Sequence, residues 1–229
     1  MKTIGLIGGT SWESTQTYYQ YLNELTGAAL GGLHSAKCVL YSLEFGELYD
    51  LMERGEWAAA GEITADAAKA LERAGAGLLH LCANTSHKIV EDIRRTCALP
   101  ILHIVDAVTA ELRRREARTV GLLGTKYTMG EDFYVPRLTG AGVQVLLPEA
   151  EAREALNRVI YEELCRGVVR GDSRAKLLAM VRELHRRGAQ AVILGCTELG
   201  MLLRDGDADV PLLDTVRIHC EAAIQKALS

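Results

Sequence analysis

The sequence contains no apolar run that approaches the roughly 20 residues a membrane-spanning helix needs. It also has no excess of positive charge: its 229 residues carry a formal net charge of −4, which argues against nucleic-acid binding. The first residues read as a strand, without the apolar core and cleavage site of a secretory signal peptide. The six cysteines show no CxxC spacing, and the histidines show no zinc-ligand pattern. We therefore expect a cytoplasmic protein with free thiols, no bound metal, no nucleic-acid partner and no membrane partner.

What the sequence does contain is an alternation of short apolar segments with longer segments of helical periodicity. Strands that alternate with helices are typical of parallel sheets, so the predicted fold class is α/β. The predicted strands are 3–7, 37–43, 78–82, 101–105, 119–123, 143–146, 191–194 and 210–213. The predicted helices are 14–25, 56–73, 88–96, 157–166, 173–186 and 219–228.

The chain also repeats itself once, through three matches that lie in the same order in both halves. They join Thr3–Gly9 to Thr119–Thr125 at an offset of 116, Gly75–Leu81 to Gly188–Leu194 at 113, and Pro100–Leu102 to Pro211–Leu213 at 111. We therefore predict two similar parallel-sheet α/β lobes related by pseudo-twofold symmetry, with the active site in the cleft between them. The first predicted lobe is 1–105 with 214–229, and the second is 106–213.

The loops that follow the predicted strands carry the candidate functional residues. The segment 8–11 (Gly-Gly-Thr-Ser) leads from a strand into a helix, where backbone N–H groups favour an anion such as a carboxylate. After the matching strand, Thr125 and Thr128 supply hydroxyls for the same kind of group. Cys196 follows another strand in a Gly-Cys-Thr context beside a helix start, where backbone dipoles should lower its pKa from about 8.5. Cys196 is therefore the candidate reactive thiol.

Four segments resemble the aspartate/glutamate racemase family, part of the Asp/Glu/hydantoin racemase superfamily, and especially its broad-specificity or L-aspartate/glutamate-specific amino-acid racemases. They are Ile4–Ser14, Asn84-Thr85, Leu122–Thr128 and Leu194–Glu198. The resemblance implies a homodimer, no metal or cofactor, and a small amino-acid or dicarboxylate substrate. It also implies two acid/base groups on opposite faces of the substrate Cα, because a single group returns the proton to the face it came from. By position in the motifs, Cys196 is the second acid/base group, and the substrate contacts are Thr10, Ser11, Asn84, Thr85, Thr125, Thr128 and Thr197.

The sequence departs from the family pattern at the first acid/base position. The family has a cysteine immediately before Asn-Thr, whereas this chain has Ala83 there and Cys82 one residue earlier. The internal repeat agrees, because it aligns Cys196 with Ala83 and not with Cys82. Neighbouring strand residues point to opposite faces, so Cys82 should point away from the substrate unless a bulge re-aims it.

A second departure concerns recognition of an acidic substrate side chain. Aspartate-specific members of the family have an arginine after the second strand and a lysine before a glycine late in the second lobe. Near the first place this chain has Glu47 and Met52, with Arg54 close by. At the second it has Cys165, followed by Arg166. These positions therefore do not by themselves predict an acidic side chain.

The leading hypothesis is a cofactor-independent amino-acid racemase that acts on L-aspartate or L-glutamate, with Cys196 as acid/base and Ala83 in place of the first cysteine. One alternative is a one-thiol enzyme of the same superfamily, catalysing asymmetric decarboxylation or α,β-elimination. Another is a catalytically decayed carboxylate-binding protein. Racemisation scrambles chirality, elimination releases ammonia and a binding protein only binds, so analysis of the products separates the three hypotheses.

Overall fold

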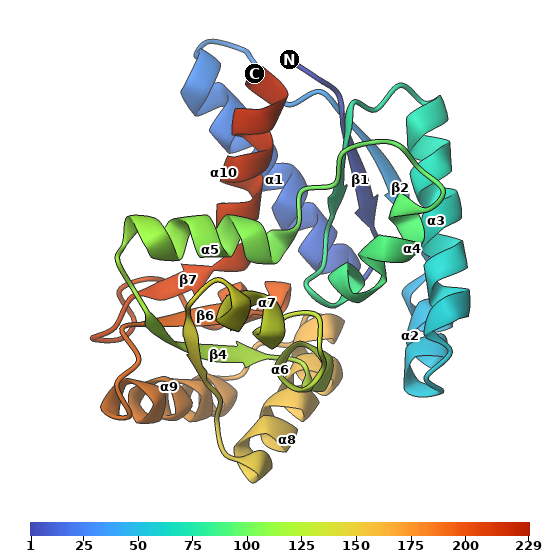
Figure 1. Cartoon of the computed structure of the whole chain (residues 1–229). Coiled ribbons are helices and arrows are strands. Elements are labelled where there is room, and N and C mark those ends of the chain that lie inside the picture. The colour runs from blue at the N-terminus through green and yellow to red at the C-terminus, as the bar shows by residue number, and fades with distance from the viewer. The chain divides into compact units, whose positions relative to one another are not determined.

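Short parallel strands, flanked by helices, organise the computed structural model, which describes residues 1–229 (Figure 1). The chain divides into two compact units. Unit 1 comprises Met1–His103 and His219–Ser229, and unit 2 comprises Ile104–Ile218. No helix combines the length and the apolar composition that crossing a membrane requires.

Unit 1 is built on a three-stranded parallel sheet in the order β2-β1-β3. All residues of the central strand β1 are buried, as expected when helices cover both faces of a parallel sheet. The strands are β1 (Ile4–Gly8), β2 (Cys38–Ser42) and β3 (Leu78–Leu81). The helices are α1 (Trp12–Leu30), α2 (Phe45–Glu53), α3 (Trp57–Arg73), η1 (Thr85–Ile89), α4 (Val90–Arg94) and most of α10 (Thr215–Leu228).

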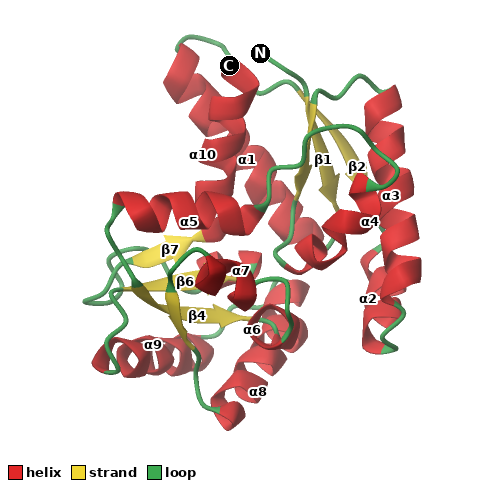
Figure 2. Cartoon of the chain, in the orientation of Figure 1, coloured by secondary structure: helices red, strands yellow, loops and turns green.

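Unit 2 is built on a four-stranded parallel sheet in the order β5-β4-β6-β7. Figure 2 shows α9 and α5 on opposite sides of this sheet. The strands are β4 (Thr119–Gly124), β5 (Gln144–Leu146), β6 (Ala191–Gly195) and β7 (Leu212–Asp214). The helical segments are α5 (Ile104–Arg114), α6 (Lys126–Gly130), α7 (Val135–Gly140), α8 (Ala150–Arg158), η2 (Val159–Glu163), η3 (Leu164–Arg166), α9 (Gly171–Arg186) and η4 (Thr197–Met201).

The two sheets pair the repeated segments in the same register. In unit 1, β1 pairs with β3 from Ile4↔Leu78 to Ile7↔Leu81, and in unit 2, β4 pairs with β6 from Val120↔Ala191 to Leu123↔Leu194. The third matched segment, which begins at Pro100 in unit 1 and at Pro211 in unit 2, forms an equivalent backbone hydrogen bond in each unit. Leu79 N donates to Pro100 O at 2.9 Å, and Val192 N donates to Pro211 O at 2.9 Å. The three sequence matches therefore correspond to matching hydrogen-bond positions within each unit.

The α/β class and parallel pairing are confirmed, but the predicted strand 101–105 is wrong. Only Ile101 forms a bridge, to Leu79, and α5 already begins at Ile104. The apolar run joins the end of one element to the start of the next, because Ile104 and Val108 belong to the buried face of a helix. The helical region predicted from residue 157 also begins earlier, at Ala150.

Candidate active site

The first strand-end loop of unit 1 is held by its own backbone and hydroxyl groups. Gly9 has a φ of +91°, and a Cβ there would collide with the carbonyl oxygen of Leu43, so only glycine fits. Gly9 N donates to Thr15 Oγ1 at 2.8 Å, and Thr15 Oγ1 donates to Ser11 O at 2.9 Å. Ser11 is the N-cap of α1, and both Thr10 and Ser11 are buried. The loop therefore presents two buried hydroxyl residues at the start of a long helix.

Cys82 lies at the end of β3, inside the core of unit 1. Its backbone N donates to Ile7 O at 2.9 Å, and its carbonyl accepts from Ser14 Oγ at 2.6 Å. The Ser14 contact joins the first turn of α1 to the end of β3. The Cys82 side chain is fully buried, and this burial raises the pKa of its thiol far above the ordinary value. Cys82 is therefore a poor source of thiolate.

Ala83 occupies the position at which the family pattern has its first cysteine. Its side chain is a methyl group, and the residue is 8% exposed. The carbonyl oxygen of Ala83 accepts a hydrogen bond from His87 Nδ1 at 2.9 Å, so this ring nitrogen carries the proton. Asn84 is buried and Thr85 is partly buried in the turn that follows. This strand end offers an amide and a hydroxyl, but no acid/base side chain at position 83.

His87 belongs to a cluster of four buried histidines in unit 1 that sequence reasoning did not identify. His80 stacks on His219 with 3.7 Å between ring centroids, and His87 lies 4.8 Å from His103 and 5.4 Å from His219. Burial, followed by the nearby His87, lowers the pKa of His80 to about 3, and burial also lowers the pKa of His219. No group of three or more residues in the chain is arranged as a metal site. His80 and His219 are therefore neutral, stacked imidazoles within this cluster.

The first strand-end loop of unit 2 carries a pair of threonines. Thr125 is the N-cap of α6, and its hydroxyl accepts from Thr128 N at 3.1 Å. The two hydroxyl oxygens are 3.2 Å apart, and both residues are buried. Gly124 and Gly195 pair at the ends of β4 and β6, and a Cβ on Gly124 would lie 3.0 Å from Gly195 O. These glycines let the two strand ends approach closely.

The second strand end of unit 2 carries a buried thiol–carboxylate pair. Cys196 Sγ donates to Glu198 Oε2 at 2.9 Å, and Thr197 Oγ1 donates to the same oxygen at 2.7 Å. Cys196 and Thr197 are each 7% exposed, and Glu198 is 3% exposed. A carboxylate that accepts a hydrogen bond from a thiol is placed to take its proton. Sequence reasoning quoted Glu198 in the motif but gave it no role; its position two residues after Cys196 was the available signal.

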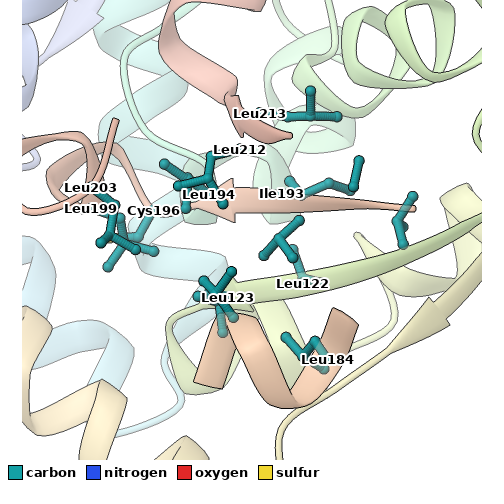
Figure 3. Packing of buried hydrophobic residues seen from close by; sticks show 14 of the residues in the cluster. Leu122, Leu123, Leu184, Ile193, Leu194, Cys196, Leu199, Leu203, Leu212 and Leu213 are labelled. Atoms are coloured by element: carbon teal, nitrogen blue, oxygen red, sulfur yellow. The ribbon is translucent and has the colours of Figure 1, made fainter. Parts of the chain in front are cut away.

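The prediction that backbone dipoles lower the Cys196 pKa is wrong. Burial raises the pKa of this thiol well above its ordinary value, and the negative charge of Glu198 raises it further. Figure 3 shows the reason, because Cys196 lies among the apolar side chains of Leu199 and Leu203. The segment that follows, η4, is a short 3₁₀ turn. Its backbone N–H groups lower the Cys196 pKa by less than burial and the Glu198 charge raise it. The thiol therefore rests protonated and donates its hydrogen bond to the Glu198 carboxylate.

The residues predicted to contact substrate thus fall into one group per unit. Within unit 1, β1 and β3 are paired, and the Ser14–Cys82 bond brings the loop of Thr10 and Ser11 to the turn of Asn84. Within unit 2, the pairing of Gly124 with Gly195 places Thr125 and Thr128 beside Cys196 and Thr197. Arg54 lies close to the position at which aspartate-specific members of the family have an arginine. Its side chain forms an ion pair with Glu56 at 2.8 Å.

The fold and these groups define an α/β protein with two parallel sheets and a buried thiol–carboxylate pair after one of the strands. Comparison with known proteins then places it in a family. The sequence profile of the Asp/Glu/Hydantoin racemase family matches residues 7–223, so the chain belongs to the Asp/Glu/hydantoin racemase family.

Three relatives illustrate the likeness. The broad specificity amino-acid racemase RacX of Bacillus subtilis (strain 168) is 26% identical over 167 residues, covering 72% of this chain and 70% of its own. The crystal structure of a proposed Asp/Glu racemase from Yersinia pestis is 46% identical, with a TM-score of 0.92, over 100% of both chains. An aspartate racemase homologue from Pyrococcus horikoshii OT3 is 38% identical, with a TM-score of 0.87, again over 100% of both chains.

Proposed function

We propose that this protein is a cofactor-independent amino-acid racemase that acts on L-aspartate or L-glutamate, with Cys196 as its acid/base group. The hydrogen bond between Cys196 Sγ and the buried Glu198 carboxylate carries the proposal, because it gives a thiol of raised pKa a local proton acceptor. Membership of the racemase family and the amino-acid racemase among the relatives support the reaction class.

In the proposed reaction, Glu198 first accepts the Cys196 proton, which leaves a thiolate beside a neutral carboxylic acid. The thiolate then takes the α-proton of the amino acid, so that the S–H bond forms again and the Cα–H bond breaks. Hydrogen-bond donors around the α-carboxylate stabilise the resulting carbanion. We assign this role to the predicted substrate contacts, namely Thr10, Ser11, Asn84, Thr85, Thr125, Thr128 and Thr197. Return of the proton from Cys196 restores the L isomer, and inversion is completed by a proton that another carrier, such as water, delivers to the opposite face of Cα.

Ala83 favours a second candidate, a one-thiol enzyme that catalyses asymmetric decarboxylation or α,β-elimination. Inversion needs a proton carrier on the face opposite Cys196, and the methyl group of Ala83 carries none. One-sided proton transfer needs only Cys196. A catalytically decayed carboxylate-binding protein is the third candidate, and it needs the hydroxyl and amide groups alone.

We further propose that the protein works in a reducing compartment such as the cytoplasm, as a homodimer. All six cysteines are free thiols, which supports the compartment. The homodimer follows the family expectation, and sedimentation equilibrium of the purified protein measures it directly.

Solvent-deuterium exchange at Cα across a panel of L- and D-amino acids tests the proposed function. We expect exchange with L-aspartate or L-glutamate, with chiral chromatography of the same samples reporting inversion. Ammonia release would instead identify elimination, and carbon dioxide release from a malonate-type acid would identify decarboxylation. Binding without exchange for every member of the panel would refute the racemase proposal and support a carboxylate-binding protein.

A further inference from the structure

A cavity of about 360 Å³ lies between α6 and α8 of unit 2. This volume is within the range of about 300–1,000 Å³ that is typical of small-molecule sites. Neither Cys196 nor the pair Thr125 and Thr128 lines it, so it is separate from the groups assigned to catalysis. Its polar lining is Lys126, Arg153, Glu154, Asn157 and Arg158, and its apolar lining is Met129 and Ala150.

The charges of this lining are unbalanced. Three cationic side chains, Lys126, Arg153 and Arg158, face one carboxylate, Glu154. Arg153 Nε is buried and has no hydrogen-bond partner, and neither arginine forms an ion pair. Elsewhere in unit 2, by contrast, Arg174 pairs with Asp207 at 2.6 Å. A buried donor without a partner costs stability, so the cavity favours a ligand that accepts hydrogen bonds.

The cavity is built on packed helices. Arg153, Glu154, Asn157 and Arg158 recur with the spacing of one helix face, so α8 turns all four toward the same side. Asn157 Oδ1 accepts from Lys126 N at 2.9 Å and thereby ties the start of α6 to α8. The start of α6 and one face of α8 are therefore held on two sides of this space, which reduces the backbone entropy lost when a ligand binds.

We propose that this cavity binds a short-chain dicarboxylate. Each carboxylate of such a ligand can accept paired hydrogen bonds from a guanidinium, and the two arginines provide two such forks. Met129 and Ala150 provide an apolar surface for the methylene groups between the carboxylates. Glu154 opposes binding through like-charge repulsion, while the three cations leave the site with a net positive charge.

Calorimetric titration of the intact protein with succinate tests this site without relying on turnover. We expect binding by the wild type, and Arg153→Gln and Arg158→Gln should each weaken it by about tenfold or more, the effect of losing one hydrogen bond to a charged group. Glu154→Gln should tighten binding, because it removes the opposing charge. Arg182→Gln is the matched control, since Arg182 is an exposed arginine of α9 outside the cavity.

Two further arms locate the ligand and define its class. Thr197→Val alters the proposed substrate site and should leave unchanged the component of succinate binding that Arg153→Gln and Arg158→Gln weaken. Succinate binding that survives Arg153→Gln and Arg158→Gln but disappears in Thr197→Val would overturn the proposal, because succinate would then occupy the substrate site.

Inorganic phosphate tests the class of ligand. It should bind more weakly than succinate, and equal affinity would overturn the assignment to dicarboxylates. No binding of succinate to the wild type would refute the site, whatever the exchange assay shows for the proposed function.

Discussion

The central strands of units 1 and 2 pair in the same register, yet the turns that follow them carry different chemistry. At the end of β6, Cys196 donates to the carboxylate of Glu198. The positions that the repeat aligns with them at the end of β3 are Ala83 and Thr85, which offer a methyl group and a hydroxyl. Backbone pairing therefore fixes where a strand-end side chain lies, and the residue type at that position decides whether it can move a proton.

The cores beneath the two strand ends differ as well. His80 of β3 is aligned by the repeat with Ile193 of β6, and both are fully buried. In unit 1 this position stacks against His219, whereas in unit 2 it belongs to a cluster of buried, mainly aliphatic side chains. The buried polar groups of the two units therefore differ: unit 1 has stacked histidines beneath its strand end, and unit 2 has a thiol–carboxylate pair after its own.

Removing the Cys196 thiol of unit 2 is expected to have the largest effect on activity. Cys196→Ser should lower Cα exchange of L-aspartate or L-glutamate by about 10²–10⁴-fold, the typical contribution of a general acid–base group. Cys38→Ser is the control, because Cys38 lies on β2 and forms no part of the proposed site. The measurement is deuterium incorporation by mass spectrometry. Unchanged exchange in Cys196→Ser would show that Cys196 is not the acid/base group, and that the thiol of unit 2 does not distinguish the two strand ends in catalysis.

Making the two strand ends alike should produce the next largest effect. Ala83→Cys places a thiol at the position aligned with Cys196 and should raise inversion relative to exchange, by up to about 10²–10⁴-fold. Chiral chromatography and deuterium incorporation on the same samples give the ratio. Cys82→Ser should change that ratio little in the wild type, because Cys82 is fully buried. Efficient wild-type inversion that Cys82→Ser abolishes would show instead that Cys82 is the missing base.

Glu198 can be tested through the pKa of its partner as well as through activity. Its negative charge is the second cause, after burial, of the raised Cys196 pKa. Glu198→Gln should therefore lower that pKa, so that thiolate absorbance appears at lower pH in a titration. The rate of exchange should nevertheless fall by about tenfold or more, because glutamine cannot accept a proton. This loss should be smaller than the loss of about 10²–10⁴-fold expected for Cys196→Ser. Glu198→Asp should restore part of the exchange, and an unchanged thiolate titration in Glu198→Gln would contradict the coupling.

Most strands could be predicted from the sequence because they are short apolar runs that end at glycine or a polar turn, whereas the apolar run 101–105 leads into a helix. The repeat even predicted that Ala83, and not Cys82, aligns with Cys196. The hydrogen bond from Cys196 to a buried Glu198 could not be predicted, because a carboxylate after a strand is usually solvated and only packing shows that this one is buried. The pKa of Cys196 was predicted in the wrong direction, because the sequence alone did not show that Leu199, Leu203 and the Glu198 carboxylate lie around the thiol.

The histidine cluster was equally hidden, because its members are far apart in the sequence and meet only in the folded unit. The cationic cavity joins Lys126 to Arg153 in the same way, across two separate helices. Local pattern thus predicted most strands, the longer helices α1, α3, α9 and α10 and the strand-end positions, but it missed helices such as α2 and α5. The electrostatic environment depended on contacts between distant segments, which periodicity does not encode.

The smallest predicted effect is on stability and uses the buried His80 of unit 1. Its pKa is lowered from 6.5 to about 3, and the titratable groups around it are His87, His103, His219 and Tyr18. Between these two pKa values the unfolded chain binds a proton that the folded chain does not. The stability is therefore complete above pH 6.5 and is lost as pH falls, by roughly 1.4 kcal/mol per pH unit for this histidine.

His80→Leu should flatten this dependence. Neither ring nitrogen of His80 has a hydrogen-bond partner, so an apolar side chain of similar size breaks no bond and should leave the stability at pH 7.5 nearly unchanged. Urea unfolding between pH 7.5 and 4 should give a shallower slope of the free energy of unfolding against pH, by roughly 1.4 kcal/mol per unit below pH 6.5. His34→Leu is the control, because His34 is exposed and outside the cluster. Equal slopes in His80→Leu and the wild type would show that the pKa of His80 is the same in the folded and unfolded protein, and that its burial does not lower it.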